Sequence, residues 1–101
     1  MTKNQIITTD EVIQTLESMK ALDITTLDTH ALSSLYSHII ICSATSIRHI
    51  HSISNALTHN TKPLLARKPT MHGPETSGWL LVDLGDIVVH IMLKEKRDYL
   101  H

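Results

Sequence analysis

The sequence contains few of the residues that mark disulfide-rich, redox-active or aromatic-rich proteins. Its 101 residues include one cysteine, one tryptophan, two tyrosines and no phenylalanine. The lone Cys42 excludes an internal disulfide, and the apolar run at residues 39–42 favours a buried thiol with no catalytic role. Because aromatic residues are so scarce, the core has to be built from isoleucine, leucine, valine and methionine.

Charge of one sign and long hydrophobic segments are also missing. Nine basic and ten acidic residues leave a net charge of −1, which does not indicate electrostatic binding of nucleic acid. No apolar run approaches the ~20 residues that cross a membrane, and residues 1–5 lack the pattern of a signal peptide. We therefore expect a protein of the cytosol, or of an organelle after removal of a leader, without membrane contact or sequence-specific nucleic-acid binding.

The remaining composition, 42% hydrophobic and 19% charged, is that of a globular protein, and the length fits one domain over residues 1–101.

Two helices are predicted from local signals. Thr8 followed three residues later by Glu11 predicts a capping box, which begins a helix that ends near Lys20. Residues 44–46 predict the cap of a second helix, with Asn60 closing it in a left-handed conformation. Apolar residues recur along this second helix at helical spacing: Ile47, Ile50, Ile53 and Leu57.

Extended segments alternate with these helices. Residues 23–28 and the apolar segment 36–43 predict two strands, the second of them central in the sheet. Residues 62–68 predict a strand that begins at Pro63 or lies at an edge, and residues 69–77 predict a loop. Residues 78–92 predict a hairpin, and residues 94–101 the start of a last helix. The order predicts an α/β fold: a single domain with a mixed five-stranded sheet flanked by helices.

The hairpin at residues 78–92 is the most informative part of the sequence. Gly85 can adopt the positive φ of a tight turn, which predicts a two-residue loop at 84–85 between Asp83 and Asp86. That register sets Trp79 opposite His90 and places two carboxylates side by side, a cost that a cationic partner would relieve. One face of this hairpin would be wholly apolar. The other face carries the candidate partner-binding residues, which are Trp79, Leu81, Asp83, Asp86, Val88 and His90.

Other interpretations of these residues have to be weighed. The mixed face of the hairpin is equally consistent with simple solvation, with Trp79 tucked under a loop. Eight histidines invite a metal hypothesis, but His49 and His51 lie two apart on a helix and point in different directions. No two histidines are four residues apart, the spacing that would place both on one face of a helix, and there is no second cysteine. We therefore expect no bound metal. Asp83 and Asp86 lack a neighbouring nucleophile, so we expect neither a catalytic site nor a cofactor.

Three segments of the sequence resemble a known protein family. Residues 78–92, GWLLVDLGDIVVHIM, are similar to the signature hairpin of the Iojap-type ribosomal silencing factor family (RsfS). Residues 20–28 resemble the segment that leads into that family's first strand, and residues 39–50 resemble its central strand, turn and helix. Together these segments cover most of residues 10–92, and the hairpin is the most specific of them.

The resemblance implies a fold distantly like that of nucleotidyltransferases, without their catalytic apparatus. It also implies that the protein binds protein number fourteen of the large ribosomal subunit, on the face that meets the small subunit. Such binding blocks subunit joining and represses translation when nutrients are scarce. Carried over to this sequence, the family's binding surface corresponds to Trp79, Leu81, Asp83, Asp86 and His90. We therefore expect a translational repressor that is not an enzyme.

The sequence departs from the family pattern at three places. Ala44 stands where glycine is usual, and His72 stands where glutamate is usual, so one acidic contact would be absent. The family continues beyond residues 97–99 into an aromatic, acidic closing helix, whereas this chain ends at His101. Two other functions stay open: an enzyme that uses Asp83 and Asp86 to hold a metal and a phosphate, and a homodimeric scaffold that pairs the hairpin face with itself.

Overall fold

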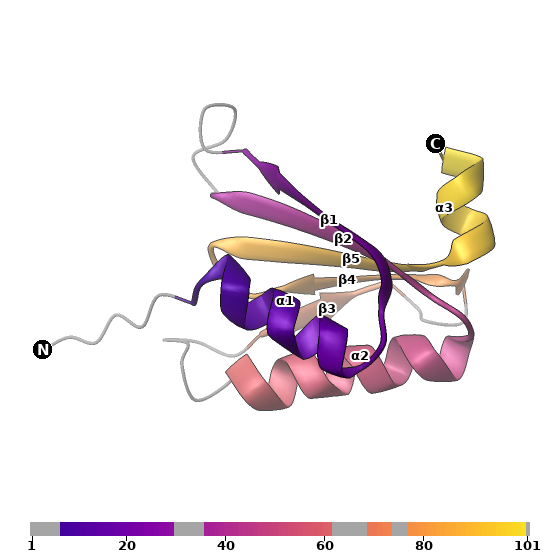
Figure 1. Ribbon diagram of the computed structural model, residues 1–101, viewed down its shortest axis with the longest axis horizontal. Helices are drawn as coiled ribbons and strands as arrows, with labels where there is room; N and C mark the ends of the chain where they lie inside the picture. Colours follow the sequence, from indigo (N-terminus) through magenta and orange to yellow (C-terminus); the bar gives the residue numbers. More distant parts are fainter. Residues whose placement is uncertain (1–6, 30–35, 62–68, 74–76, 101) are drawn as a thin grey trace, which may run out of the picture.

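The computed structural model describes residues 7–29, 36–61, 69–73 and 77–100. The predicted α/β fold with a mixed five-stranded sheet is confirmed (Figure 1). In chain order the elements are α1 (Thr9–Ser18), β1 (Leu22–Asp28), β2 (His38–Ala44), α2 (Ile47–Thr61), β3 (Thr70–His72), β4 (Trp79–Asp83), β5 (Ile87–Leu93) and α3 (Lys94–Leu100).

Local sequence signals account for the start of both long helices. The side chain of Thr8 accepts a hydrogen bond from the amide of Glu11 at 3.2 Å, and Glu11 Oε1 accepts one from the amide of Thr8 at 2.9 Å. These two bonds form the predicted capping box. Ser46 caps α2 with a single bond, because its hydroxyl oxygen accepts the amide of His49 at 3.0 Å. Helix α1 ends at Ser18, two residues before the expected end.

The strand order in the sheet is β1-β2-β5-β4-β3. Strands β2 and β5 run parallel, and every other neighbouring pair is antiparallel. The middle strand is therefore β5, which corrects the expectation that the segment at 36–43 would be central. Strand β2 is still interior, since β1 and β5 pair with its two edges. The parallel pair requires a crossover, and α2 lies on that connection.

Helices α1 and α2 lie side by side against one face of the sheet, and α3 stands at the end of β5 (Figure 1). The core lies between this helix pair and the sheet. Its helical part includes Val12, Leu16, Ile50, Ile53 and Leu57, which have no exposed surface. The sheet contributes the alternate residues of its three inner strands: Ile40, Cys42, Leu80, Val82, Val89 and Ile91. No helix among the described residues has the length and apolar character that crossing a membrane requires.

The third strand is not the one expected from the sequence. Residues 70–72 form β3, at the edge of the sheet, although the pattern assigned residues 69–77 to a loop. The expected strand at residues 62–68 lies outside the described residues. A segment of three residues is too short to show an alternating pattern in the sequence. These residues form a strand because they pair with β4, where Thr70 is opposite Asp83 and His72 is opposite Leu81.

Asn60 does not close α2 in a left-handed conformation, which corrects a second expectation. The helix continues to Thr61, and Asn60 is not among the described residues with positive φ. Its side chain has another role, because Asn60 Nδ2 donates to the hydroxyl of Thr15 on α1 at 3.2 Å. The Thr15 hydroxyl donates in turn to the carbonyl oxygen of Glu11 at 3.2 Å. This chain of bonds ties the end of α2 to the middle of α1.

Candidate partner-binding face

The hairpin of β4 and β5 turns one residue later than the sequence pattern indicated. The amide of Leu84 donates to the carbonyl oxygen of Ile87 at 2.9 Å, so Gly85 and Asp86 occupy the turn. Gly85 has φ +99°, as expected of a glycine in this turn. The observed pairs are Trp79 with Met92, Leu80 with Ile91, Leu81 with His90, Val82 with Val89 and Asp83 with Val88.

This register corrects the expected pairing but leaves the two faces unchanged. Each residue of β4 pairs with a residue of β5 two positions beyond the expected one, and a shift of two restores every side chain to its original face. Trp79 is therefore opposite Met92, and His90 is its diagonal neighbour. The carboxylates of Asp83 and Asp86 are not cross-strand neighbours, because Asp83 pairs with Val88 and Asp86 lies in the turn.

The two aspartates have different surroundings. Asp83 is half-buried, and its Oδ1 accepts the amide of Gly85 at 2.9 Å, which holds the turn. Its Oδ2 accepts a hydrogen bond from the Tyr36 hydroxyl at 3.4 Å. The Asp86 side chain is exposed, and its backbone carbonyl accepts the amide of Ser37 at 2.8 Å. Asp83 thus supports the fold locally, whereas the Asp86 carboxylate projects into solvent.

We call the face of the sheet opposite α1 and α2 the open face. Strand pairing places on it alternate residues of the five strands: Thr25, Leu27, Ile39, Ile41, Ser43, Thr70, His72, Trp79, Leu81, Asp83, Val88, His90 and Met92. Five of the six candidate partner-binding residues belong to this face, and Asp86 lies at its border in the turn. Trp79 is 37% exposed and Leu81 is half-buried, but Val88 is only 3% exposed. Val88 therefore supports the neighbouring side chains more than it offers a surface of its own.

Two hollows lie on the open face. The first has a volume of about 410 Å³, and its walls are mainly apolar: Leu27, Ile39, Ile41, Trp79, His90, Met92 and Arg97. The second has a volume of about 360 Å³ and is lined by His72, Gly73, Ser77, Trp79, Leu81 and His90. Trp79 and His90 line both hollows, so this pair forms the ridge between them. The sequence pattern placed Trp79 and His90 on the same face of the hairpin but did not indicate the first hollow, whose floor comes from β1, β2 and β5.

The two ridge side chains contact each other directly. The indole Nε1–H of Trp79 donates to Nδ1 of His90 at 3.1 Å. The ring centroids are 5.9 Å apart, and the ring planes are inclined by 55°. Partial burial lowers the pKa of His90 below its ordinary value of 6.5, because the charged imidazolium loses hydration there. At neutral pH the ring is therefore uncharged and can accept the indole proton.

Arg97 of α3 forms part of the wall of the first hollow. Its guanidinium donates to the hydroxyl of Thr25 at 2.8 Å and to that of Ser43 at 3.3 Å. It also donates to the carbonyl oxygen of Asp23, where β1 departs from regular geometry. Asp23 itself has φ +51°. These bonds join α3 to β1 and β2, and they fix one cation beside an apolar hollow.

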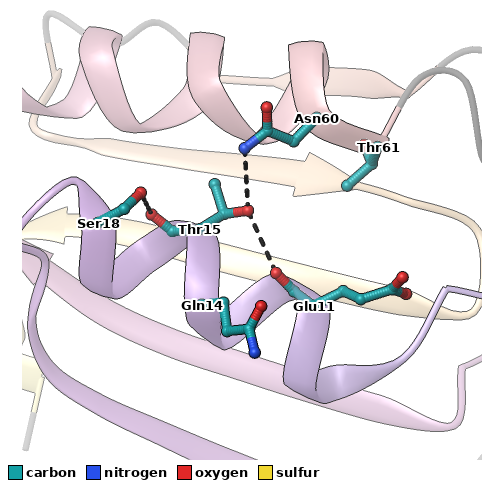
Figure 2. Close-up of a pocket in the computed structure, with 6 residues that line it drawn as sticks. All are labelled: Glu11, Gln14, Thr15, Ser18, Asn60 and Thr61. Atoms are coloured by element: carbon teal, nitrogen blue, oxygen red, sulfur yellow. Dashed lines mark hydrogen bonds between the residues drawn. The ribbon is translucent and has the colours of Figure 1, made fainter.

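A third hollow, between α1 and α2, has a polar lining and a volume of about 280 Å³ (Figure 2). Its walls are formed by Glu11, Gln14, Thr15, Ser18, Asn60 and Thr61. Several of these polar groups bond to one another, as the Asn60–Thr15–Glu11 chain already shows (Figure 2). The Ser18 hydroxyl likewise donates to the carbonyl oxygen of Thr15 at 2.7 Å. This hollow therefore belongs to the helix contact.

The histidines do not form a shared ligand set in the part of the chain that the structure describes. No group of three or more histidine, cysteine, aspartate or glutamate side chains is placed there to hold a metal ion. Both ring nitrogens of His49 are engaged: Nδ1 accepts the amide of Thr45 at 3.0 Å, and Nε2 lies 2.8 Å from the carbonyl oxygen of Met19. His49 thus joins the start of α2 to the end of α1.

The sequence also matches a family model over nearly its whole length. The model describes "Ribosomal silencing factor during starvation", and residues 2–101 match it. The chain belongs to the RsfS family. The resemblance of the hairpin and the two upstream segments is therefore confirmed.

Curated relatives in this family span bacteria and mitochondria. The chain is 38% identical to the ribosomal silencing factor RsfS of Chromobacterium violaceum, over 86% of this chain and 71% of that protein. It is 32% identical to RsfS of Haemophilus influenzae, over 86% of this chain and 85% of that protein. A mouse protein named "Mitochondrial assembly of ribosomal large subunit protein 1" is 30% identical over 88% of this chain and 40% of its own length.

Solved structures support the RsfS assignment at the level of the fold. A crystal structure of a Chromobacterium violaceum protein superimposes with a TM-score of 0.81 and 36% identity, over 90% of this chain and 76% of that one. A Bacillus halodurans structure gives a TM-score of 0.78 and 25% identity, over 90% of this chain and 85% of that one. The RsfS family is linked by its names to the ribosome and its large subunit.

Proposed function

We propose that this protein silences translation by binding the large ribosomal subunit through ribosomal protein number fourteen. Bound there, it would occupy the face that meets the small subunit and would prevent joining by its bulk alone. This mechanism requires binding but no chemical step, and it needs neither metal nor cofactor. We also propose that the protein acts in the cytoplasm.

The observation that carries this proposal is the open face of a chain that belongs to the RsfS family. Trp79 projects from it between two hollows, with 37% of its surface exposed. Partly exposed aromatic residues beside apolar hollows are the usual energetic anchors of protein interfaces. The exposed Asp86 at the border would meet basic groups of the ribosomal protein and would speed association more than it adds affinity.

Sedimentation with separated ribosomal subunits tests the proposal. The protein should co-sediment with free large subunits and much less with joined ribosomes, because joining covers the site. The Trp79→Ala variant should bind large subunits at least about tenfold more weakly, as expected when an interface anchor is removed. The control is Arg48→Ala, which removes a long exposed side chain on α2, away from the open face.

Three outcomes would contradict the proposal. Equal recovery with large subunits and joined ribosomes would exclude occlusion of the joining face. Magnesium-dependent turnover of a nucleotide would instead favour the alternative of an enzyme that uses Asp83 and Asp86 to hold a metal and a phosphate. A concentration-dependent mass without ribosome binding would favour the homodimeric scaffold, with the open face of one copy against that of another.

A further inference from the structure

The ridge between the two hollows depends on one hydrogen bond. Trp79 is partly exposed, and its position opposite Met92 does not by itself fix the rotation of its ring. The bond from Trp79 Nε1 to His90 Nδ1, at 3.1 Å, fixes that rotation. Both hollows have the indole and the imidazole in their walls, so the same bond sets the shape of both.

The direction of this bond determines the protonation state of His90. An indole N–H can only donate, so Nδ1 of His90 has to accept with its lone pair. The proton of the neutral ring is therefore on Nε2. Protonation of the ring would add a proton to Nδ1. The N–H of Trp79 and the N–H at His90 Nδ1 would then face each other across 3.1 Å, and neither can accept.

A cation–π contact does not replace the lost bond in this geometry. His90 faces the N–H edge of the indole, which is the positive part of the ring quadrupole, and the attraction of a cation is to the ring face. The charged imidazolium would therefore repel the indole edge. Because Trp79 is 37% exposed and borders two hollows, its ring has space to move away.

The charged and titratable groups around His90 come from three other elements. Arg97 of α3 lines the first hollow with it, and His72 of β3 lines the second. Asp83 of β4 lies on the same face and is a diagonal neighbour of His90, because His90 is opposite Leu81 and Asp83 follows Leu81 by two residues. The neighbouring open-face residues of β2, Ile39 and Ile41, do not titrate. His72 is the other imidazole among these groups, which makes it the necessary control.

We propose that His90 is a positioning residue for Trp79 and a proton-sensitive latch on the partner-binding face. The neutral imidazole of His90 holds the indole of Trp79 in its position between the two hollows. Once the imidazole is protonated, the bond is lost and the indole is free to rotate away. Binding of the ribosomal partner therefore weakens as the pH falls. This inference rests on the proposed function only for the identity of the partner, since the latch itself is a property of the isolated chain.

The first test uses the protein alone. Trp79 is the single tryptophan, so its fluorescence reports on the ridge without interference. Its emission should change as the pH falls, with a midpoint below 6.5, because burial lowers the pKa of His90. In His90→Gln, whose amide oxygen still accepts the indole proton but does not titrate, that transition should be absent. In His72→Gln it should stay at the same midpoint. Persistence of the transition in His90→Gln, in protein that melts as the wild type does, would overturn the latch.

The second test measures the affinity for free large subunits across the same pH range. If only the neutral form binds, the apparent dissociation constant should rise by up to about tenfold per pH unit below the midpoint. In the His90→Gln variant, the dissociation constants at low and at neutral pH should be equal, whatever the affinity of this variant at neutral pH. Binding that is independent of pH in the wild type would overturn the inference while leaving the proposed function intact. Absence of binding at every pH, with the fluorescence transition present, would overturn the proposed function.

Discussion

The amide of Leu93, at the end of β5, donates a hydrogen bond to the carbonyl oxygen of Gly78, 2.8 Å away, immediately before β4 begins. This bond closes the open end of the hairpin and helps to hold Trp79 opposite Met92. It brings the two backbones so close that a Cβ on Gly78 would lie 2.9 Å from Leu93 Cδ1. Gly78 also has φ +84°, a conformation that other L-residues rarely adopt.

Substitution of Gly78 should therefore destabilise the protein more than substitution of Gly85. Gly85 has φ +99°, but a Cβ there would meet no atom within 4 Å, so Gly85→Ala should cost only the backbone strain, about 1–2 kcal/mol. Gly78→Ala adds a clash with Leu93 and should cost about 1 kcal/mol more. Urea denaturation of the two variants measures the difference. Equal losses would show that the Leu93 side chain moves aside freely.

Loss of the Asp83 carboxylate should destabilise the protein, whereas loss of the Asp86 carboxylate should not. Removal of the Asp83 carboxylate leaves the amide of Gly85 without its acceptor, so Asp83→Ala should lower the free energy of unfolding by about 1–2 kcal/mol. Asp86→Ala changes an exposed side chain and should stay within about 0.5 kcal/mol. Thermal melts compare the two variants, and equal losses would contradict the division.

Asp86 is consequently the better probe of an acidic contact with the ribosome. Asp86→Lys should keep the wild-type melting temperature and should weaken binding to large subunits, with the larger effect at low ionic strength. Normal binding by this folded variant would show that the turn carboxylate is not part of the interface. The sequence pattern placed both aspartates on the partner-binding face, because it could not show that Asp83 bonds back to the turn.

Local signals in the sequence were sufficient for the two long helices. The capping box of Thr8 and Glu11 and the buried stripe of Ile50, Ile53 and Leu57 depend on residues at most four positions apart. The faces of the hairpin were also predictable, since alternation survives a shift of two residues. The register itself was not, because the choice between turn centres at 84–85 and 85–86 depends on backbone geometry rather than on composition.

Features created by pairing between distant segments could not be predicted. Strand β3 exists because Thr70 and His72 align with β4, and no pattern in three residues predicts it. The first hollow joins Leu27, Ile41 and Arg97, which come from β1, β2 and α3. Only the strand order β1-β2-β5-β4-β3 brings these residues beside Trp79. A list of apolar residues contains most of them but does not say which share a face.

The buried thiol of Cys42 predicts how stability depends on alkaline pH. Burial raises the pKa of this thiol from 9.0 to about 12, and the positive charge of Arg97 opposes this shift only in part. The unfolded chain therefore loses the thiol proton first as the pH rises. The contribution of Cys42 is fully present below pH 9 and is lost between pH 9 and about 12, by up to about 1.4 kcal/mol per pH unit. Comparison with Cys42→Ala in urea denaturation isolates the contribution of this thiol. Parallel pH profiles for the two proteins would contradict it.

Two substitutions of the same kind, on opposite faces of the hairpin, should separate folding from binding. Val89 has no exposed surface and faces the helices, so Val89→Asp would bury an unpaired charge and should cost several kcal/mol, roughly enough to unfold a small domain. Leu81 lies on the open face, half-buried beside the second hollow, where water can reach a carboxylate. Leu81→Asp should therefore fold cooperatively, with a modest loss of melting temperature, and should still fail to co-sediment with large subunits.

Circular dichroism melts measure the folding of both variants, and sedimentation with large subunits measures their binding. If folded Leu81→Asp protein binds as the wild type does, the partner does not contact the open face at β4, and the binding site has to be sought elsewhere on the molecule.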